Sequence, residues 1–160
     1  MDIPLSSLIE KLQLKEHPEG GYYRETFRSD RQVHTESGPR SSSTAIYYLL
    51  PSTDFSGWHR VKSDEVWHHY RGQALRLHLL DESGYRSVQL GKALNPEQHH
   101  QFVVQAGCWQ AAEVIGKGYT LCGCTVAPGF DFADFEMGTQ EGMLAEYPTQ
   151  GAAIASWVKP

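Results

Sequence analysis

The residues best suited to carry chemistry lie in one stretch of the chain, residues 57–72, which holds three of its eight histidines. In that stretch His59 precedes Glu65 and His69. An imidazole and a carboxylate directed into one cavity can bind a divalent metal through nitrogen and oxygen, or serve as a general base and the group that orients it. The residue types therefore predict a metal site or a proton-transfer site around His59 and Glu65.

Glu65, Trp67 and His69 fall on one side of the strand that we expect over residues 64–70, because side chains alternate between the two faces of a strand. We therefore place Trp67 and His69 beside Glu65 in a ligand pocket, with His68 on the opposite face. The alternative for Trp67 is packing in the core, where large aromatic side chains are usually found. The alternative for His69 is a structural role in the core or at an interface.

A helix is expected before these strands, because Leu5, Leu8, Ile9 and Leu12 recur at helical spacing. After it, short segments rich in β-branched and aromatic residues alternate with Gly, Pro, Ser and Asp. This pattern is typical of an all-β sandwich or barrel. The expected strands are Tyr22–Phe27, Thr44–Leu50, Trp58–Val61, Asp64–Tyr70, Leu75–Leu80, Tyr85–Leu90, Gln101–Val104, Trp109–Val114 and Tyr119–Val126, and a short carboxy-terminal helix is expected over Glu141–Glu146.

Composition and charge limit the classes of partner. With 14 Lys and Arg against 19 Asp and Glu, the formal net charge is -5, which argues against nucleic acid. The longest apolar run, residues 45–50, is far shorter than a membrane helix, and the chain starts with Met1 and Asp2 rather than a basic signal region. Three cysteines without a framework spacing fit reduced thiols. We therefore expect no nucleic-acid partner, no membrane and a cytoplasmic location.

The stretch around His59 resembles the first sequence motif of the cupin superfamily. In that motif a Gly precedes a His-x-His pair, a Glu follows after a few residues, and a second Gly closes the hairpin. His59 stands at the first His, Glu65 at the Glu and Gly72 at the closing Gly. Val61 replaces the second His, so this ligand position of the motif carries a side chain that cannot bind a metal.

The second cupin motif, a Pro-x-Gly followed by a His, is echoed in residues 105–110. Gly107 keeps its place, and Gln110 stands where the third His ligand would be. The resemblance therefore implies that a divalent metal, if one binds, is held by His59, Glu65 and Gln110. An amide oxygen suits hard ions better than it suits zinc, copper or iron, so we expect a weakened site.

Five segments of the chain together resemble one small cupin family that is usually filed as a domain of unknown function. The resemblance runs from about residue 17 to about residue 135. It implies one domain over residues 1–160, built as a jelly-roll barrel over about residues 20–130 and usually paired into a homodimer. The five segments are 17–26, 44–50, 58–61, 64–68 and 126–132.

Without a metal, the same pocket could still move protons, because burial and a nearby carboxylate shift the pKa of a His. The arrangement is similar to that of cupin-like deoxysugar epimerases, which implies that His59 is the base, Glu65 its partner and a Tyr the acid. Tyr48 is our pocket candidate for that acid, with Tyr22 and Tyr70 as the alternatives.

Three functions follow from these observations. The leading hypothesis is a cupin that binds a small polar, sugar-like metabolite and acts on it by isomerase- or epimerase-type proton transfer. The second is a non-catalytic module that binds a small molecule and leaves it unchanged. The third is a metal-dependent enzyme such as a dioxygenase or isomerase. A divalent metal is the one cofactor that the residue types suggest.

Overall fold

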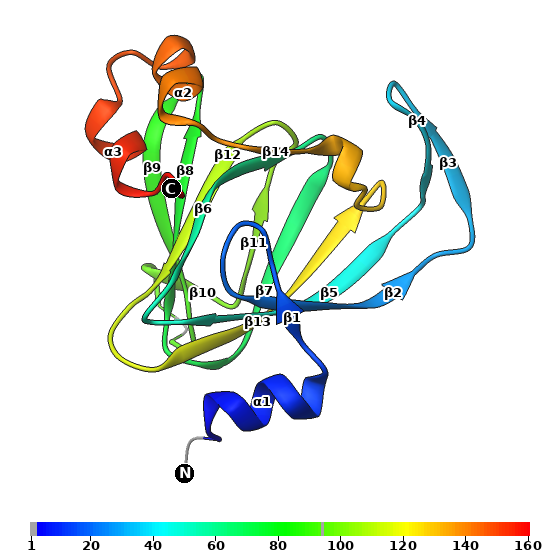
Figure 1. Ribbon diagram of the computed structural model, residues 1–160, viewed down its shortest axis with the longest axis vertical. Coiled ribbons are helices and arrows are strands. Elements are labelled where there is room, and N and C mark those ends of the chain that lie inside the picture. Colours follow the sequence, from blue (N-terminus) through cyan, green and yellow to red (C-terminus); the bar gives the residue numbers. More distant parts are fainter. Residues whose placement is uncertain (1–2, 94) are drawn as a thin grey trace.

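Two six-stranded sheets enclose the core in this computed structural model, which describes residues 3–93 and 95–160 (Figure 1). One sheet has the strand order β1-β2-β5-β13-β7-β11, and the other has the order β10-β9-β8-β12-β6-β14. The chain crosses between the sheets at nearly every step from β5 to β13, as in a jelly roll. The strands are β1 (Lys15–Glu16), β2 (Tyr22–Arg28), β5 (Thr44–Pro51), β6 (Phe55–Val61), β7 (Asp64–Gly72), β8 (Leu75–Asp81), β9 (Gly84–Leu90), β10 (Gln98–His99), β11 (Gln101–Val104), β12 (Trp109–Val114), β13 (Tyr119–Ala127) and β14 (Phe135–Met137).

The all-β jelly-roll prediction is confirmed, and all nine expected strands are present as β2, β5 to β9 and β11 to β13, with ends moved by at most three residues. The alternation that predicted them is visible in the burial of β8. Leu75, Leu77 and Leu79 belong to the core between the sheets. On the outer side of the same strand, His78 stacks on Trp157 with a ring-centroid distance of 4.5 Å. The inner row of leucines therefore fixes which face of β8 meets the opposite sheet.

Helix α1 (Leu5–Leu12) packs against the outer face of the first sheet (Figure 1). Its buried Leu8 packs in one cluster with Leu49 of β5 and Tyr119 of β13. The helical spacing of leucines therefore predicted both the helix and its apolar face. No helix in the described part of the chain has the length and apolar character that a membrane span requires.

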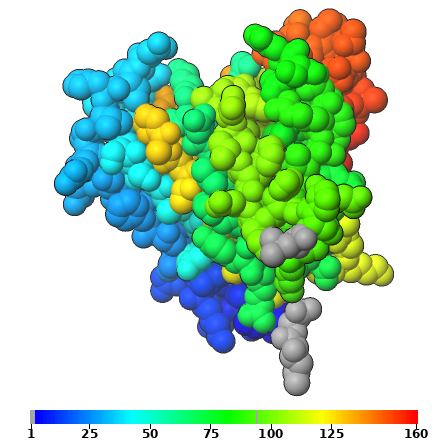
Figure 2. Space-filling view, turned by 180° about the vertical axis from the view of Figure 1, so that it is seen from behind, coloured from blue at the N-terminus to red at the C-terminus, as the bar shows by residue number. Residues whose placement is uncertain are grey.

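Strands β3 (Gln32–Thr35) and β4 (Gly38–Ser41) form a separate hairpin that projects from the barrel as an arm (Figure 1). The sequence did not predict this hairpin, because its Gly, Ser and charged residues are typical of a loop. Arg40 ties the arm to the segment after β13 through two hydrogen bonds to Asp134, of 2.8 and 2.9 Å. In the space-filling view the amber surface of that segment lies between the blue-cyan arm and the green barrel strands (Figure 2).

The carboxy-terminal part covers the outer side of the second sheet. It contains η1 (Phe132–Asp134), helix α2 (Gln140–Glu146), which was expected, and helix α3 (Gly151–Ser156), which was not. The sequence of α3 has one large apolar residue, Ile154, so it shows no helical period; Ile154 is nevertheless fully buried in a cluster with Trp58. The carboxy-terminal helices thus pack against the strand that carries His59.

Candidate functional site

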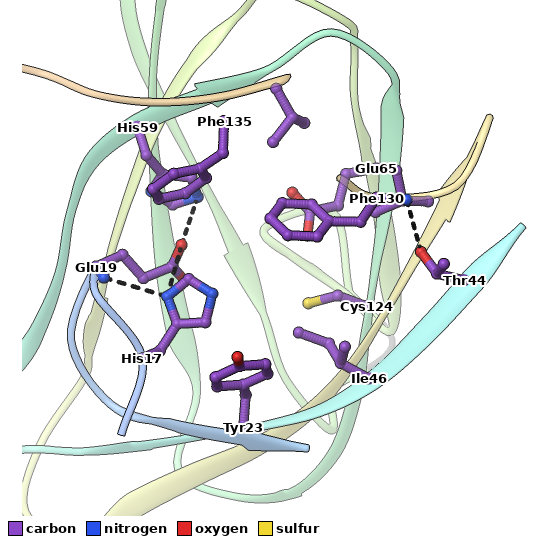
Figure 3. Close-up of a pocket in the computed structure, with 12 residues that line it drawn as sticks. His17, Glu19, Tyr23, Thr44, Ile46, His59, Glu65, Cys124, Phe130 and Phe135 are labelled. Carbon is purple, nitrogen blue, oxygen red and sulfur yellow. Dashed lines mark hydrogen bonds and ion pairs between the residues drawn. The ribbon is translucent and has the colours of Figure 1, made fainter. Parts of the chain in front are cut away.

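A cavity lies inside the barrel and contains about 460 Å³ of space not filled by atoms, its mouth included. Only about 30 Å³ of this space is open to the centre of a water-sized molecule, so the cavity is narrow. The side chains that surround it come from both sheets, from the turn before β2 and from the segment after β13 (Figure 3). They are His17, Glu19, Tyr23, Thr44, Ile46, His59, Val61, Glu65, Cys124, Val126, Phe130 and Phe135.

His59, on β6, is held as an imidazolium. Its Nδ1 lies 2.7 Å from the carbonyl oxygen of Gly57, and its Nε2 lies 3.0 Å from Oε2 of Glu19. Because both neighbours are acceptors, both ring nitrogens donate, which requires the charged ring. Burial opposes this charge, but the charge and hydrogen bond of Glu19 outweigh it and raise the pKa of His59 to about 9. A charged ring has no lone pair, so His59 does not rest in the form of a base.

Glu19, and not Glu65, is the carboxylate that contacts His59. It lies in the turn between β1 and β2, and its carbonyl oxygen accepts a hydrogen bond of 2.7 Å from the backbone N–H of Gly57. This bond fixes the turn to the strand that carries His59. Burial favours the neutral form of Glu19, but His59 and His17 overcome that effect and lower the pKa of Glu19 to about 2.

His17 is a neutral imidazole whose proton sits on the nitrogen that faces the cavity. The backbone N–H of Glu19 donates to Nδ1 of His17 at 3.1 Å, so Nδ1 carries the lone pair and Nε2 carries the hydrogen. Burial lowers the pKa of His17, although Glu19 opposes the shift. Nε2 points toward the centre of the cavity, beside Tyr23, whose ring packs edge-on against His17 (Figure 3).

Glu65, on β7, lies across the cavity from His59 and His17 (Figure 3). Gln110 donates to Oε2 of Glu65 at 2.6 Å, and Trp67 donates to the amide oxygen of Gln110 at 2.8 Å. Burial raises the pKa of Glu65 to about 6, even though His59 and the bond from Gln110 favour the charged form. Glu65 is therefore a carboxylate that can gain and lose a proton near neutral pH.

Four residues that we expected in the pocket lie outside its lining. Trp67 and Gln110 stand behind Glu65 and are fully buried. Tyr48 is also buried in the core. Its hydroxyl donates to the carbonyl oxygen of Gly20 at 2.8 Å and so stabilises the turn that carries Glu19. His69 lies further along β7, where its Nε2 is 2.9 Å from the carbonyl oxygen of Gln73. Trp67 and His69 were placed beside Glu65 because they alternate with it along β7, but each step of two residues carries the side chain further along the strand and away from the cavity.

The two alternative tyrosines are also outside the cavity. Tyr70 is 54% exposed on the outer face of its sheet, and Tyr22 packs in the cluster under α1. The tyrosine that lines the cavity is Tyr23. Tyr22 and Tyr23 are neighbours on β2, so their side chains point to opposite faces of the sheet. Which of them reaches the cavity depends on which face of β2 is turned inward.

The family model for the cupin superfamily (DUF985) matches residues 6–138 of this chain. The chain belongs to this cupin family. It is 30% identical to the uncharacterized protein YML079W of Saccharomyces cerevisiae in an alignment of 170 positions, which covers 94% of this cupin and 84% of the yeast protein. It is 35% identical to the structure of a hypothetical protein from Leishmania major, with a TM-score of 0.91, covering 99% of this cupin and 100% of that chain.

Oxalate decarboxylase from Bacillus subtilis shares the fold of this cupin at 14% identity, with a TM-score of 0.57 over 89% of this chain and 36% of that chain. At that identity the likeness shows the fold alone. The resemblance to cupins that the sequence motifs indicated is therefore confirmed by the family model and by the fold.

The metal set expected from the cupin motifs, His59, Glu65 and Gln110, does not fit a metal ion. Both nitrogens of His59 donate to oxygen acceptors, and the amide oxygen of Gln110 accepts from Trp67. Only Glu65 then has an atom free to coordinate, where a stable site needs at least three protein ligands. Across residues 3–93 and 95–160, no three His, Cys, Asp or Glu side chains are grouped so as to hold one ion.

Sequence reasoning missed His17, Glu19, Tyr23, Phe130 and Phe135 as cavity residues. Their segments were noted as part of the family resemblance, and that signal could have identified them. The alternation of residues along strands cannot identify most of these residues. The turn before β2 and the segment after β13 have no periodicity that fixes where their side chains point.

Proposed function

We propose that this cupin catalyses the transfer of a proton next to the carbonyl group of a small molecule, an isomerase- or epimerase-type reaction. One observation carries this proposal. Glu65, with a pKa raised to about 6, faces two groups across the cavity that do not compete for its proton: the neutral ring of His17 and the imidazolium of His59, whose pKa is about 9. Titratable groups whose environments separate their pKa values identify the base and the acid of a site.

Glu65 is the base in this mechanism. A carboxylate with a pKa near 6 is mostly ionised at neutral pH, yet it binds a proton well enough to remove one from carbon. Gln110 donates to one carboxylate oxygen of Glu65, and the thiol of Cys124 also hydrogen-bonds to this carboxylate, which borders the cavity. The thiol of Cys124 stays protonated, because burial raises its pKa well above the ordinary value.

His17 and Tyr23 are the donors that receive the carbonyl oxygen. The Nε2–H of His17 and the hydroxyl of Tyr23 lie side by side on the wall opposite Glu65 (Figure 3). A neutral imidazole suits this role, because it stabilises an enolate by hydrogen bonding and does not give up its proton to it in the resting enzyme. Glu19 selects the tautomer through its backbone N–H.

The reaction balances with these groups alone. Glu65 takes the proton from the carbon next to the carbonyl, and the electron pair of the broken C–H bond forms a C=C bond. The carbonyl oxygen takes the negative charge, which His17 and Tyr23 stabilise. The protonated Glu65 then returns the proton to carbon. Return to the same carbon after the enolate has turned over in the cavity gives the epimer, and return to the far end of a conjugated C=C bond, in a substrate that has one, gives the isomer.

His59 and Glu19 are positioning residues. The ion pair between them is almost fully buried, with side chains 3% and 7% exposed. It holds the turn that carries His17 against β6, and the positive ring lowers the energy of a negative charge that develops in the cavity. His59 therefore has a role in the site that differs from the base expected from the sequence.

The test is the exchange of a carbon-bound proton for deuterium in a small ketone, followed by proton NMR in D2O. Cyclohexanone is a suitable first probe, since its α-protons are acidic enough to exchange. We expect Glu65→Gln to reduce the enzyme-dependent rate by at least about 100-fold, because it removes the base and keeps an acceptor for Gln110. Glu97→Gln, at an exposed glutamate, is the matched control and should leave the rate unchanged.

The pH profile gives a second readout. The rate should rise with pH and level off above about 6, where Glu65 is ionised. Equal rates in Glu65→Gln and the unaltered chain would contradict the proposal. A ketone that binds and is recovered without deuterium would instead favour the non-catalytic binding module.

We also propose a homodimer in a reducing, cytoplasmic compartment. The dimer rests on the cupin resemblance and on three exposed apolar side chains of the first sheet, Phe27, Tyr70 and Val103. The compartment rests on the three cysteines, Cys108, Cys122 and Cys124, which are buried and free.

A further inference from the structure

The walls of the cavity between His17 and Glu65 are apolar. Ile46 comes from β5, Val61 from β6 and Val126 from β13. Phe130, from the loop after β13, and Phe135, the first residue of β14, complete the apolar lining (Figure 3). These five side chains come from five separate parts of the chain, and none of them can form a hydrogen bond with a hydroxyl group.

The aromatic rings narrow this space into a slot. The ring of Phe135 lies 5.8 Å from that of His17 and 6.0 Å from that of Phe130, both in edge-to-face contact. His17 in turn contacts Tyr23 at 4.6 Å. Rings arranged in this way present flat faces and edges to a ligand, and such surfaces favour an apolar or aromatic body.

Few polar groups of the lining are free to pair with a ligand. Thr44 accepts a hydrogen bond from the backbone N–H of Phe130 at 2.9 Å, and Glu19 is engaged by His59. The groups left are Nε2–H of His17, the hydroxyl of Tyr23, the O–H of Thr44, which can still donate, and the carboxylate of Glu65. His17, Tyr23 and Glu65 match a single carbonyl group and its neighbouring C–H bond, which leaves the O–H of Thr44 for a further polar group.

The lining also contains no Arg or Lys. The imidazolium of His59 is a cation of the lining, but Glu19 balances its charge and both of its N–H groups are engaged by Gly57 and Glu19. An anionic ligand group would therefore face the carboxylate of Glu65 without a free cationic donor to pair with. A sugar would bring several hydroxyl groups against Ile46, Val61 and the phenylalanines, and each buried hydroxyl without a partner weakens binding by about 5-fold to 150-fold.

We infer that the substrate of this site is an uncharged carbonyl compound with an apolar body, and not the sugar-like metabolite that the sequence suggested. The inference rests on the proposed proton transfer, since it uses the same donors and the same base. It goes further in naming the body of the substrate: a flat or compact hydrocarbon group that fits between Phe130, Phe135 and Ile46.

Two probes that share one ring test this inference. Cyclohexanone has an apolar body, whereas scyllo-inosose is the same cyclic ketone with a hydroxyl on each of the other five carbons. We expect ligand-detected NMR to show that cyclohexanone binds at millimolar or lower concentration. Scyllo-inosose should bind at least about 30-fold more weakly, because two or more of its hydroxyls lack partners.

Val61→Thr is the informative variant, because Thr keeps the shape of Val and adds one hydroxyl to the wall. It should reduce the preference for cyclohexanone by at least about 3-fold, while circular dichroism shows the fold unchanged. Val103→Thr is the matched control, since Val103 is 49% exposed on the outside of the barrel and should leave the preference unchanged.

Equal binding of the two probes, tighter binding of scyllo-inosose, or no binding of cyclohexanone would overturn the inference. A different outcome would contradict the proposed proton transfer alone. If cyclohexanone binds selectively and its α-protons do not exchange in D2O, the cavity is apolar as inferred, and the proton transfer is wrong.

Discussion

The ionised form of Glu65 destabilises the folded protein, because its carboxylate is buried. Its pKa is higher in the folded protein, about 6, than the ordinary value of 4.5, so the folded state binds the proton more tightly than the unfolded chain. The contribution of this group to stability is therefore fully present below about pH 4.5 and is lost as the pH rises through about 6. At neutral pH the protein keeps a buried carboxylate that the fold disfavours, which is typical of a functional group.

Glu65→Gln should therefore stabilise the protein at neutral pH while it removes the activity. A shift of about 1.5 pKa units corresponds to about 2 kcal/mol. We expect the free energy of unfolding of Glu65→Gln, relative to the unaltered chain, to be about 2 kcal/mol more favourable at pH 7.5 than at pH 4. Urea titrations at the two pH values measure this difference. A difference that does not change with pH would mean that Glu65 is not held in a disfavoured charged form.

At the scale of elements, the turn between β1 and β2 decides the geometry of the site. It carries both His17 and Glu19, and three contacts hold it: the bond from Gly57 to Glu19, the bond from Tyr48 to Gly20, and the bond from the backbone N–H of Gly21 to Asp54. Gly20 has a φ of 109°, and a Cβ at this position would lie 2.2 Å from the carbonyl oxygen of Phe55. The turn can lie this close to β6 only because residue 20 has no side chain.

Gly20→Ala should therefore be far more damaging than the same change at a glycine that has space. Gly84 has a φ of 92°, but its Cβ would meet nothing closer than 3.7 Å. We expect Gly84→Ala to cost about 1–3 kcal/mol for backbone strain alone, and Gly20→Ala to cost at least about 2 kcal/mol more for the clash. Urea denaturation gives both values.

The same pair of variants reports on the site. NMR of the histidine rings should show that Gly20→Ala lowers the pKa of His59, because Glu19 moves away, and that Gly84→Ala leaves it near 9. An unchanged His59 in Gly20→Ala would show that the turn does not position the ion pair.

At the scale of the whole molecule, the first sheet leaves apolar side chains on its outer face. Phe27, Tyr70 and Val103 are 53%, 54% and 49% exposed. Val103 pairs with Val66 across β11 and β7, so the patch reaches the edge of the sheet. A cluster of exposed apolar residues on one face is typical of an interface, and two copies of the same face can cover each other around a two-fold axis.

Light scattering should therefore give a mass of twice 18.0 kDa for the unaltered chain at micromolar concentration. Val103→Asp should shift the protein toward the monomer, because it places a charge in the apolar patch, whereas Ser87→Asp on the exposed outer side of the second sheet should not. A monomer in all three proteins would contradict the homodimer.

The sequence by itself determined the architecture of the barrel. Alternating apolar residues in segments such as Leu75–Leu80 decide which face of a strand is buried, and the leucines of residues 5–12 decide the first helix, because both patterns depend only on local geometry. The alternation along the strands and the cupin motif together predicted that His59 and Glu65 line one cavity, and both do. The sequence did not predict the β3–β4 arm, α3 or β14, because contacts between residues distant in sequence stabilise these elements.

Only the tertiary structure decided which groups work together. His59 is about 40 residues from Glu19 in sequence, and the two meet because Gly57 binds the turn that carries Glu19. That contact makes His59 a cation, so the reaction that we propose uses Glu65 as the base, the reverse of the assignment made from the motif. Protonation states depend on the nearest charges and on burial, and both are properties of the folded chain that no spacing of residues records.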